Sequence, residues 1–255
     1  MWGAIERLAG LEPDTPAQAM VLADGVLRYR QEGDGPPVVL IHGMAGSTRW
    51  WSRNVAALRD SHTVYRVDLL GWGASRGNRF SLATAADTLA TWHDRLGLET
   101  AAYVGHSMGG FITTDLATRY PELVSRLVLV NGAVLPLAYG PVGAAMALAR
   151  EATRLRPAFI PILTADSLRA GPFTFARATA QLALADLSQR VTEVRCPSLL
   201  IWGARDALVP VEMGRRLHRM LPRAELVEIS GAGHNPMFDR PAEFNAALTR
   251  FLSDG

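Results

Sequence analysis

One stretch, residues 101–111, limits what this chain can fold into more than any other. It reads Ala-Ala-Tyr-Val-Gly-His-Ser-Met-Gly-Gly-Phe and predicts a short buried strand over 101–104, a sharp turn at Ser107 and a helix that runs toward Tyr120. Glycines stand two residues before and two residues after the serine, where the close approach of strand and helix leaves no room for a side chain. Such a turn directs the Ser107 hydroxyl outward at the carboxyl end of the strand. It also places the backbone N–H of Met108 at a helix N-terminus, where the helix dipole favours negative charge.

The rest of the chain alternates between two hydrophobic patterns. Predominantly apolar runs, typical of strands buried on both faces, occur at 38–41, 64–69, 101–104, 127–130, 199–202 and 226–229. Helical periodicity lies between and after them, at 50–58, 82–96, 109–120, 211–221 and 242–252. A hairpin over 21–30, with Asp24-Gly25 as its two-residue turn, precedes the first run. We therefore predict an α/β fold, with a mostly parallel central sheet flanked by helices, as a single domain over residues 1–255.

One segment, residues 134–190, interrupts this alternation. It contains no convincing strand, and its helical patterns over 142–155 and 173–187 are separated by Pro157, Pro161 and Gly171-Pro172. A helical insertion that leaves one strand and returns to the next is best placed over the carboxyl edge of the sheet. We expect a helical cap there, rich in apolar side chains.

Composition excludes several classes of function. The net charge is +2, so no strong attraction to nucleic acid is expected, and the chain contains arginine but no lysine. Cys196 is the only cysteine, which excludes disulfides within the chain and thiolate-rich metal sites. The first residues lack a basic segment followed by a long apolar core, and the apolar run 142–149 is too short to span a bilayer. We expect a cytoplasmic protein without a membrane span. Residues 1–17 predict a short amphipathic helix to which we assign no role, and the oligomeric state stays open.

Residues suited to chemistry follow several of the predicted strands. His42-Gly43-Met44 comes after the first apolar run, Ser107 after the third, Asp206 after the fifth and His234 after the last. In open α/β sheets, ligands bind at the carboxyl ends of the strands. A serine, an acid and a histidine thus occur in chain order at the edge where a site is expected.

These motifs resemble those of the α/β-hydrolase fold superfamily, in its capped, esterase-like branch of serine hydrolases. The resemblance extends from about residue 21 to 252 and rests on H-G-x-x-G-S at 42–47, D-x-x-G-x-G-x-S at 68–75, G-H-S-M-G-G at 105–110, W-G-x-x-D at 202–206 and G-x-G-H-x-P at 231–236. It implies that Ser107 is the nucleophile, His234 the base and Asp206 the acid that orients the base. It also implies that the N–H groups of Met44 and Met108 form the oxyanion hole.

Other residues compete for these roles. His42 also ends a strand, but we expect it to hydrogen-bond behind the oxyanion loop, and we expect His106 to point away from the site. His62, His93 and His218 lie in polar or helical-surface patterns and are expected to be solvated. Asp68 is the alternative acid, although in the family this position orders the neighbouring loop.

The resemblance implies a carboxylesterase that works through an acyl-enzyme intermediate and needs no cofactor or metal. Its substrate would be an ester with a small to medium apolar acyl group, for which we assign Trp50, Phe173 and Phe175 as candidate pocket residues; for Trp50, simple packing is an equal alternative. The remaining enzymatic alternatives are a carbon–carbon bond hydrolase, a thioesterase and a carrier-protein methyl-ester esterase. The alternative from another class is a ligand receptor with low turnover. The arginines of the cap predict either a solvated face, which we favour, or a surface for an acidic partner.

Overall fold

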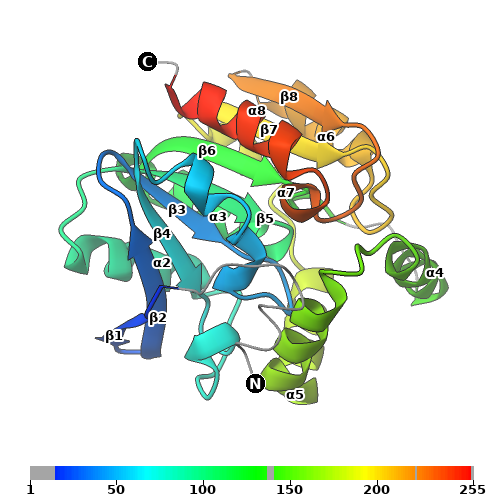
Figure 1. Cartoon of the computed structure of the whole chain (residues 1–255), viewed down its shortest axis with the longest axis horizontal. Coiled ribbons are helices and arrows are strands. Elements are labelled where there is room, and N and C mark those ends of the chain that lie inside the picture. The colour runs from blue at the N-terminus through cyan, green and yellow to red at the C-terminus, as the bar shows by residue number, and fades with distance from the viewer. Residues whose placement is uncertain (1–14, 137–140, 222, 254–255) are drawn as a thin grey trace.

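The computed structural model describes residues 15–136, 141–221 and 223–253, and Figure 1 shows their arrangement. Most of the predicted helix over 1–17 lies outside these residues, and 15–17 form no regular element. The described chain builds an eight-stranded sheet in the order β1-β2-β4-β3-β5-β6-β7-β8. The strands are β1 (Gln18–Leu22), β2 (Gly25–Glu32), β3 (Pro37–Ile41), β4 (Thr63–Asp68), β5 (Ala101–His106), β6 (Val124–Val130), β7 (Ser198–Gly203) and β8 (Ala224–Ile229).

The sheet is mostly parallel, as the apolar runs predicted. β2 pairs antiparallel with both of its neighbours, whereas β4, β3, β5, β6, β7 and β8 pair in parallel. All six predicted runs fall on β3 to β8. The runs on β3, β5, β6 and β7 are apolar without alternation because both faces of this part of the sheet are buried, whereas β4 also holds Arg66 and Asp68 and β8 holds the exposed Glu228.

The helices divide between the two faces. On one face α2 (Ala85–Arg95), α3 (Met108–Arg119) and α6 (Val211–Met220) contribute Leu89, Ile112 and Leu217 to the larger apolar cluster. On the other face α7 (Pro236–Asp239) and α8 (Pro241–Ser253) contribute Phe238 and Phe244. Each of these five side chains is fully buried, which stabilises the fold by about 1.5–3 kcal/mol per side chain.

Two local predictions are wrong in detail. The hairpin turn is Ala23-Asp24, and Gly25 is the first residue of β2, where its φ of 143° and a collision of any Cβ with the side chain of Asn78 require glycine. The predicted helix over 50–58 is instead two short 3₁₀ turns, η1 (Thr48–Trp51) and η2 (Val55–Ala57). Three further 3₁₀ turns are η3 (Gly73–Ser75), η4 (Pro121–Leu123) and η5 (Val191–Glu193).

Residues 134–190, which we call the insert, hold two helices and no strand within their described part. They are α4 (Pro141–Ala152) and α5 (Ile160–Ala183), and α5 begins earlier than the predicted 173. Pro161 is tolerated because it lies in the first turn, where its missing N–H has no intrahelical partner. Gly171, with φ 74° and ψ 164°, then kinks the helix before Pro172. Figure 1 shows α4 and α5 beyond the arrowheads of β3 and β5.

The described residues offer neither a membrane span nor a metal cluster. None of the helices in residues 15–136, 141–221 and 223–253 has the length and apolar character needed to cross a membrane. The same ranges contain no cluster of three or more histidine, cysteine or acidic side chains arranged to hold a metal ion.

Candidate active site

Ser107 occupies the turn between β5 and α3 in the strained backbone that the glycine spacing predicted. Its φ of 52° and ψ of −116° are rare for a residue with a side chain, and such strain costs about 1–3 kcal/mol. The neighbouring strand holds the turn in place, because the Ser107 N–H donates to the carbonyl of Val130 at 2.9 Å. A Cβ on Gly109 would lie 2.6 Å from the carbonyl oxygen of Ile41, so the helix can approach β3 this closely only with glycine there.

His234 and Asp206 form a hydrogen-bonded pair at the ends of β8 and β7. The His234 Nδ1–H donates to Asp206 Oδ2 at 2.7 Å, while the N–H groups of Leu208 and Val209 donate to Asp206 Oδ1 at 2.7 and 3.0 Å. Burial lowers the pKa of His234, but the charge and hydrogen bond of Asp206, with the charges of Glu151 and Asp239, raise that pKa above its ordinary value overall. With the proton fixed on Nδ1, Nε2 of the neutral ring is available as a base.

Ser107 and His234 line one cavity of about 300 Å³. Its walls are largely apolar and include Leu155, Phe159 and Leu163 from the insert. Ser107 itself is 8% exposed, so a ligand reaches it through this cavity rather than from open solvent. A serine hydroxyl and an imidazole thus line the same, largely apolar cavity.

The loop after β3 runs along Ser107. A Cβ on Gly43 would lie 3.0 Å from Ser107 Cβ, and Met44 lines the cavity. Met108, the first residue of α3, follows Ser107 directly and is fully buried. Of the two residues predicted to donate backbone N–H groups to an oxyanion, Met108 thus adjoins Ser107 in the chain and Met44 lines the same cavity as Ser107.

Both ring nitrogens of His42 are hydrogen-bonded to the backbone. Its Nδ1–H donates to the carbonyl of Gly43 at 2.7 Å and its Nε2 accepts from the N–H of Leu69 at 3.1 Å, behind the loop as expected. Burial lowers its pKa. Two other histidines differ from the prediction, because His62 and His93 are buried rather than solvated; only His218 is exposed. Their burial was missed because both lie next to polar residues in sequence but turn inward in the fold.

Asp68 orders the loops beside the site. Its carboxylate accepts the N–H of Thr48 at 2.8 Å and of Ala74 at 3.0 Å, and it pairs with Arg30 at 3.7 Å. Asp206, not Asp68, accepts from the His234 ring. This geometry matches the role expected for each acid.

Two residues that hold the pair together were missed from the sequence. The fully buried Asn131 donates from Nδ2 to Asp206 Oδ2, and its Oδ1 accepts from the N–H of Gly203 at 3.1 Å. His106, expected to point elsewhere, lines the cavity and donates from Nε2 to the carbonyl of His234 at 2.8 Å. Burial, then the neighbouring His234, keeps the pKa of His106 well below its ordinary value, so it stays neutral. A polar residue directly after a buried apolar strand was the available signal for both.

The insert also brings two buried carboxylates to the site. Glu151 on α4 contacts the loops of His234 and Asp206. Asp166 on α5 accepts from the hydroxyl of Ser47 at 2.7 Å and from the indole N–H of Trp50 at 3.1 Å, both at Oδ2. Helical periodicity places each among exposed residues and does not distinguish it, so neither was predicted.

The three candidate pocket residues have different positions. Trp50 is buried and lines the cavity, and Phe175 lines it while remaining 41% exposed. Phe173 is 89% exposed and is not among the lining residues. The two phenylalanines are two positions apart on α5 and therefore point to different sides of the helix, so only the second reaches the chamber.

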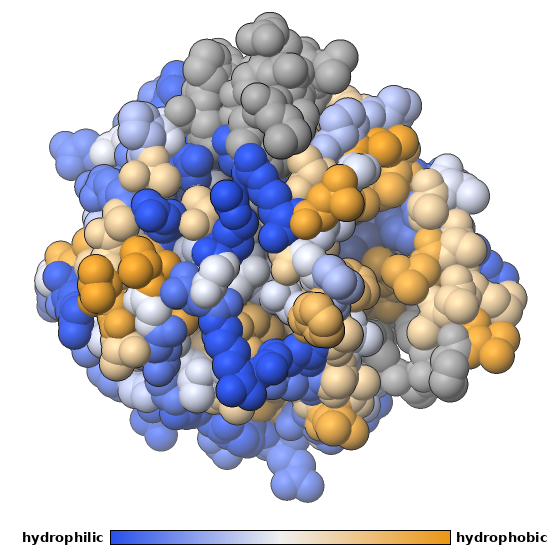
Figure 2. Space-filling model, turned by 90° about the horizontal axis from the view of Figure 1, so that it is seen from below, coloured by the Kyte–Doolittle hydropathy of each residue, from blue (hydrophilic) through white to orange (hydrophobic). Residues whose placement is uncertain are grey.

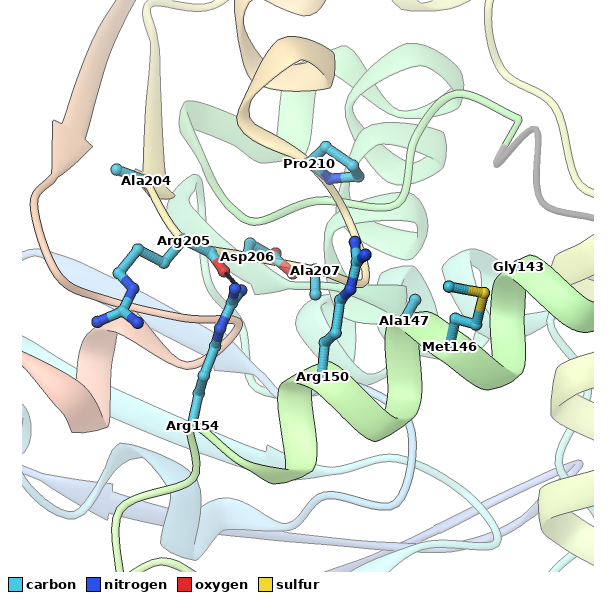
Figure 3. A pocket seen from close by; sticks show the side chains of 10 residues that line it. All are labelled: Gly143, Met146, Ala147, Arg150, Arg154, Ala204, Arg205, Asp206, Ala207 and Pro210. Carbon is cyan, nitrogen blue, oxygen red and sulfur yellow. Dashed lines mark hydrogen bonds between the residues drawn. The ribbon is translucent and has the colours of Figure 1, made fainter.

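A second, larger cavity of about 490 Å³ lies between α4 and the loop after β7. Figure 3 shows Arg150 of α4 and Arg154, just past the end of α4, extending toward this loop, and Arg154 donates to the carbonyl of Arg205. Neither serine nor histidine lines it.

Figure 2 shows hydrophobic surface around a hollow on the side where Figure 1 places α4. Most of the exposed large apolar side chains belong to the insert: Val142, Met146, Leu148, Ile160, Leu168, Phe173, Phe175 and Leu184.

Comparison with known proteins gives four matches. A model of the alpha/beta hydrolase family matches residues 38–247. A 2-hydroxy-6-oxononadienedioate/2-hydroxy-6-oxononatrienedioate hydrolase of Burkholderia vietnamiensis is 30% identical and the match covers 94% of this chain and 96% of that protein. A protein of Pseudomonas savastanoi provisionally named carbamate hydrolase RutD is also 30% identical, over 88% of this chain and 96% of its own. Among solved structures, a bacterial membrane phospholipase A superposes with a TM-score of 0.80 at 25% identity, covering 98% of this chain and 88% of that one.

Proposed function

Because this chain belongs to the alpha/beta hydrolase family, we propose that it is a serine hydrolase that cleaves carboxylic esters of small to medium apolar acyl groups. The family predicted from the motifs is confirmed, and hydrolysis is the activity named for its relatives. The observation that carries the proposal is the shared cavity, with Ser107 and the Asp206-bonded His234 on its wall.

The reaction assigns a step to each group. Ser107 Oγ attacks the ester carbonyl while His234 Nε2 takes its proton, and the N–H groups of Met44 and Met108 stabilise the oxyanion. The bond to the alcohol breaks, and the alcohol leaves with the proton from His234. Water then attacks the acyl-enzyme, giving its proton to His234, and the acid departs as Ser107 recovers a proton. Asp206 stabilises the imidazolium in both halves.

The cavity supports an apolar acyl group. Aliphatic and aromatic side chains dominate its wall. The one acidic side chain there is Glu151, which disfavours a negatively charged substrate. We propose that the insert acts as a cap that forms the roof of this chamber. By excluding water it lowers the local dielectric and strengthens the hydrogen bonds to the oxyanion.

Carbon–carbon bond hydrolysis is the second candidate, because the relative from Burkholderia vietnamiensis is named for a dienedioate substrate. The lining residues of the chamber include no arginine that could pair with the carboxylates of such a substrate. We therefore favour esters, with thioesters, carrier-protein methyl esters and carbamates as further acyl substrates of the same machinery. A ligand receptor would keep the chamber and turn over little.

A panel of p-nitrophenyl esters of graded acyl length tests the proposal directly. We expect multiple turnovers with a preference for short to medium chains, and no turnover with Ser107→Ala, whose fold is retained because the hydroxyl faces the cavity. A fluorophosphonate should label Ser107 and no other serine. Labelling of Ser47 or Ser75 would contradict the assignment, and tight ligand binding with only a few turnovers would favour the receptor.

A further inference from the structure

The carboxylate of Glu151 connects α4 to both loops that carry the hydrogen-bonded pair. Its Oε1 accepts the backbone N–H of His234 at 2.7 Å, and its Oε2 accepts the backbone N–H of Ala207, next to Asp206, at 3.2 Å. The residue is only 5% exposed, although it lies on a helix whose neighbouring positions face solvent. One side chain of the insert thus holds two segments that are 27 residues apart in sequence.

The surroundings are shaped for this contact. A Cβ on Gly233 would lie 2.5 Å from Glu151 Oε1, so the glycine before the histidine leaves the space that the carboxylate occupies. Arg154, two residues past the end of α4, donates to the carbonyl of Arg205 and connects the same end of this helix to the loop of Asp206 (Figure 3). The contact is therefore part of a docked interface rather than the chance position of a flexible side chain.

We propose that Glu151 is a positioning residue, through which docking of α4 sets the geometry and charge of the His234–Asp206 pair. This inference rests on the proposed function of that pair in ester hydrolysis. With α4 docked, the carboxylate holds the two loops at a fixed separation and adds negative charge behind the base. With α4 displaced, both contacts are lost, so the enzyme is fully active only when the insert covers the chamber.

The charges around His234 make the second effect measurable. The charges of Asp206, Glu151 and Asp239 each favour the protonated ring, whereas burial disfavours it. The neutral His106 ring lies 4.8 Å from the His234 ring, measured between centroids. Removing the charge of Glu151 should therefore lower the pKa of His234. A residue that merely filled space on α4 would leave this pKa unchanged.

Glu151→Gln, nearly identical in shape, tests the proposal. Its amide has one acceptor oxygen, so it cannot accept both N–H groups as the carboxylate does. With the best p-nitrophenyl ester we expect kcat to fall about tenfold or more with little change in KM. The acidic limb of the pH profile of kcat/KM should shift to lower pH. Glu151→Asp keeps the charge on a shorter side chain, and should lower kcat while leaving the limb near its wild-type position. Glu122→Gln, the same substitution at an exposed residue of η4, should change neither.

Gly233→Ala provides an independent variant that leaves the charge in place. Its methyl group would displace the Glu151 carboxylate, so we expect a loss of kcat comparable to that of Glu151→Asp. In a Glu151→Ala background the same methyl group no longer collides with a carboxylate, because its next neighbour, Asp239 Oδ2, lies at 3.5 Å, an ordinary contact distance. Gly233→Ala should then have little further effect, and the double-mutant cycle would show strong coupling.

An NMR titration of the His234 ring in labelled protein separates this inference from the proposed function, because it requires no substrate. A lower His234 pKa in Glu151→Gln than in wild type supports the proposal even if no ester is turned over. The proposal is overturned if Glu151→Gln only lowers the melting temperature and leaves both the His234 titration and kcat unchanged. Additive effects of the Glu151 and Gly233 substitutions would overturn it as well.

Discussion

At the scale of single residues, the two buried acids Asp206 and Asp68 have different partners. Asp206 bonds to the ring of His234, whereas Asp68 bonds to the neighbouring loops. Asp206 accepts from the His234 ring and from the N–H groups of Leu208 and Val209, so its carboxylate cannot rotate away from the ring. Asp68 accepts from Thr48 and Ala74 and pairs with Arg30. Both carboxylates are fully bonded, but only the first contacts a group that must change its protonation during the proposed reaction.

Substitution of each acid by asparagine should therefore have different consequences. Asp206→Asn places an amide where the His234 Nδ1–H needs an acceptor, and we expect kcat to fall by about 10⁴-fold with little loss of stability. Asp68→Asn removes charge from the Arg30 pair and weakens two loop contacts. It should cost about 1–3 kcal/mol of unfolding free energy while retaining most of kcat. Kinetics and urea unfolding of both variants provide the measurement. The reverse ranking of kcat would assign the catalytic acid to Asp68.

At the scale of elements, the helical spacing of α5 decides which apolar residues of the insert face the chamber. Phe173 and Phe175 are two positions apart on a helix, and positions so spaced point about 200° apart. Phe175 accordingly lines the chamber and Phe173 faces solvent. The sequence offered both as pocket residues because it did not reveal which side of the helix meets the sheet.

This pair supplies a matched test of the proposed roof. Phe175→Ala should enlarge the chamber and shift the preference in kcat/KM toward longer or bulkier acyl groups. Phe173→Ala, the same truncation on the exposed side, should leave the ranking of the ester panel unchanged. Both variants should still react with a small fluorophosphonate at nearly the wild-type rate, because the turn at Ser107 is untouched. If the ranking were the same in wild type and Phe175→Ala, α5 would have no part in acyl selection.

At the scale of the whole molecule, the sheet could be predicted closely and the contacts of the insert could not. The runs 38–41 and 199–202 predict strands because burial on both faces demands uninterrupted apolar residues, and they lie within β3 and β7. Ser107, Asp206 and His234 were placed by the same logic, since each follows such a strand. Glu151 and Asp166 depend instead on how helices dock across long sequence separations, for which local periodicity carries no signal. The turn at Ala23-Asp24 differed for a similar reason, because the distant Asn78 requires glycine at the next position.

The docking of α5 makes the stability of the whole molecule depend on pH through Asp166. This carboxyl is 1% exposed, and its Oδ1 has no hydrogen-bond partner among the described residues. Burial raises its pKa to about 7, with a further contribution from the charge of Asp68. Hydrogen bonds from Ser47 and Trp50 and the charge of Arg49 act in the opposite direction.

The folded protein therefore keeps this proton over a range in which the unfolded chain has lost it, from about pH 4 to about pH 7. Since the folded state binds more protons there, the unfolding free energy should decrease as the pH rises through this window. The decrease should amount to at most about 4 kcal/mol and should stop above pH 7.

Asp166→Asn, which is neutral at every pH and retains an acceptor for Ser47 and Trp50, should lack this component. Its stability relative to wild type should therefore increase from pH 4.5 to pH 8 in urea unfolding. Asp186→Asn, at an exposed carboxyl of the same insert whose pKa is lowered by hydrogen bonds from Ser188, is the control and should show no such increase. A difference between Asp166→Asn and wild type that stayed constant with pH would mean that Asp166 is ionised in the folded protein throughout this range.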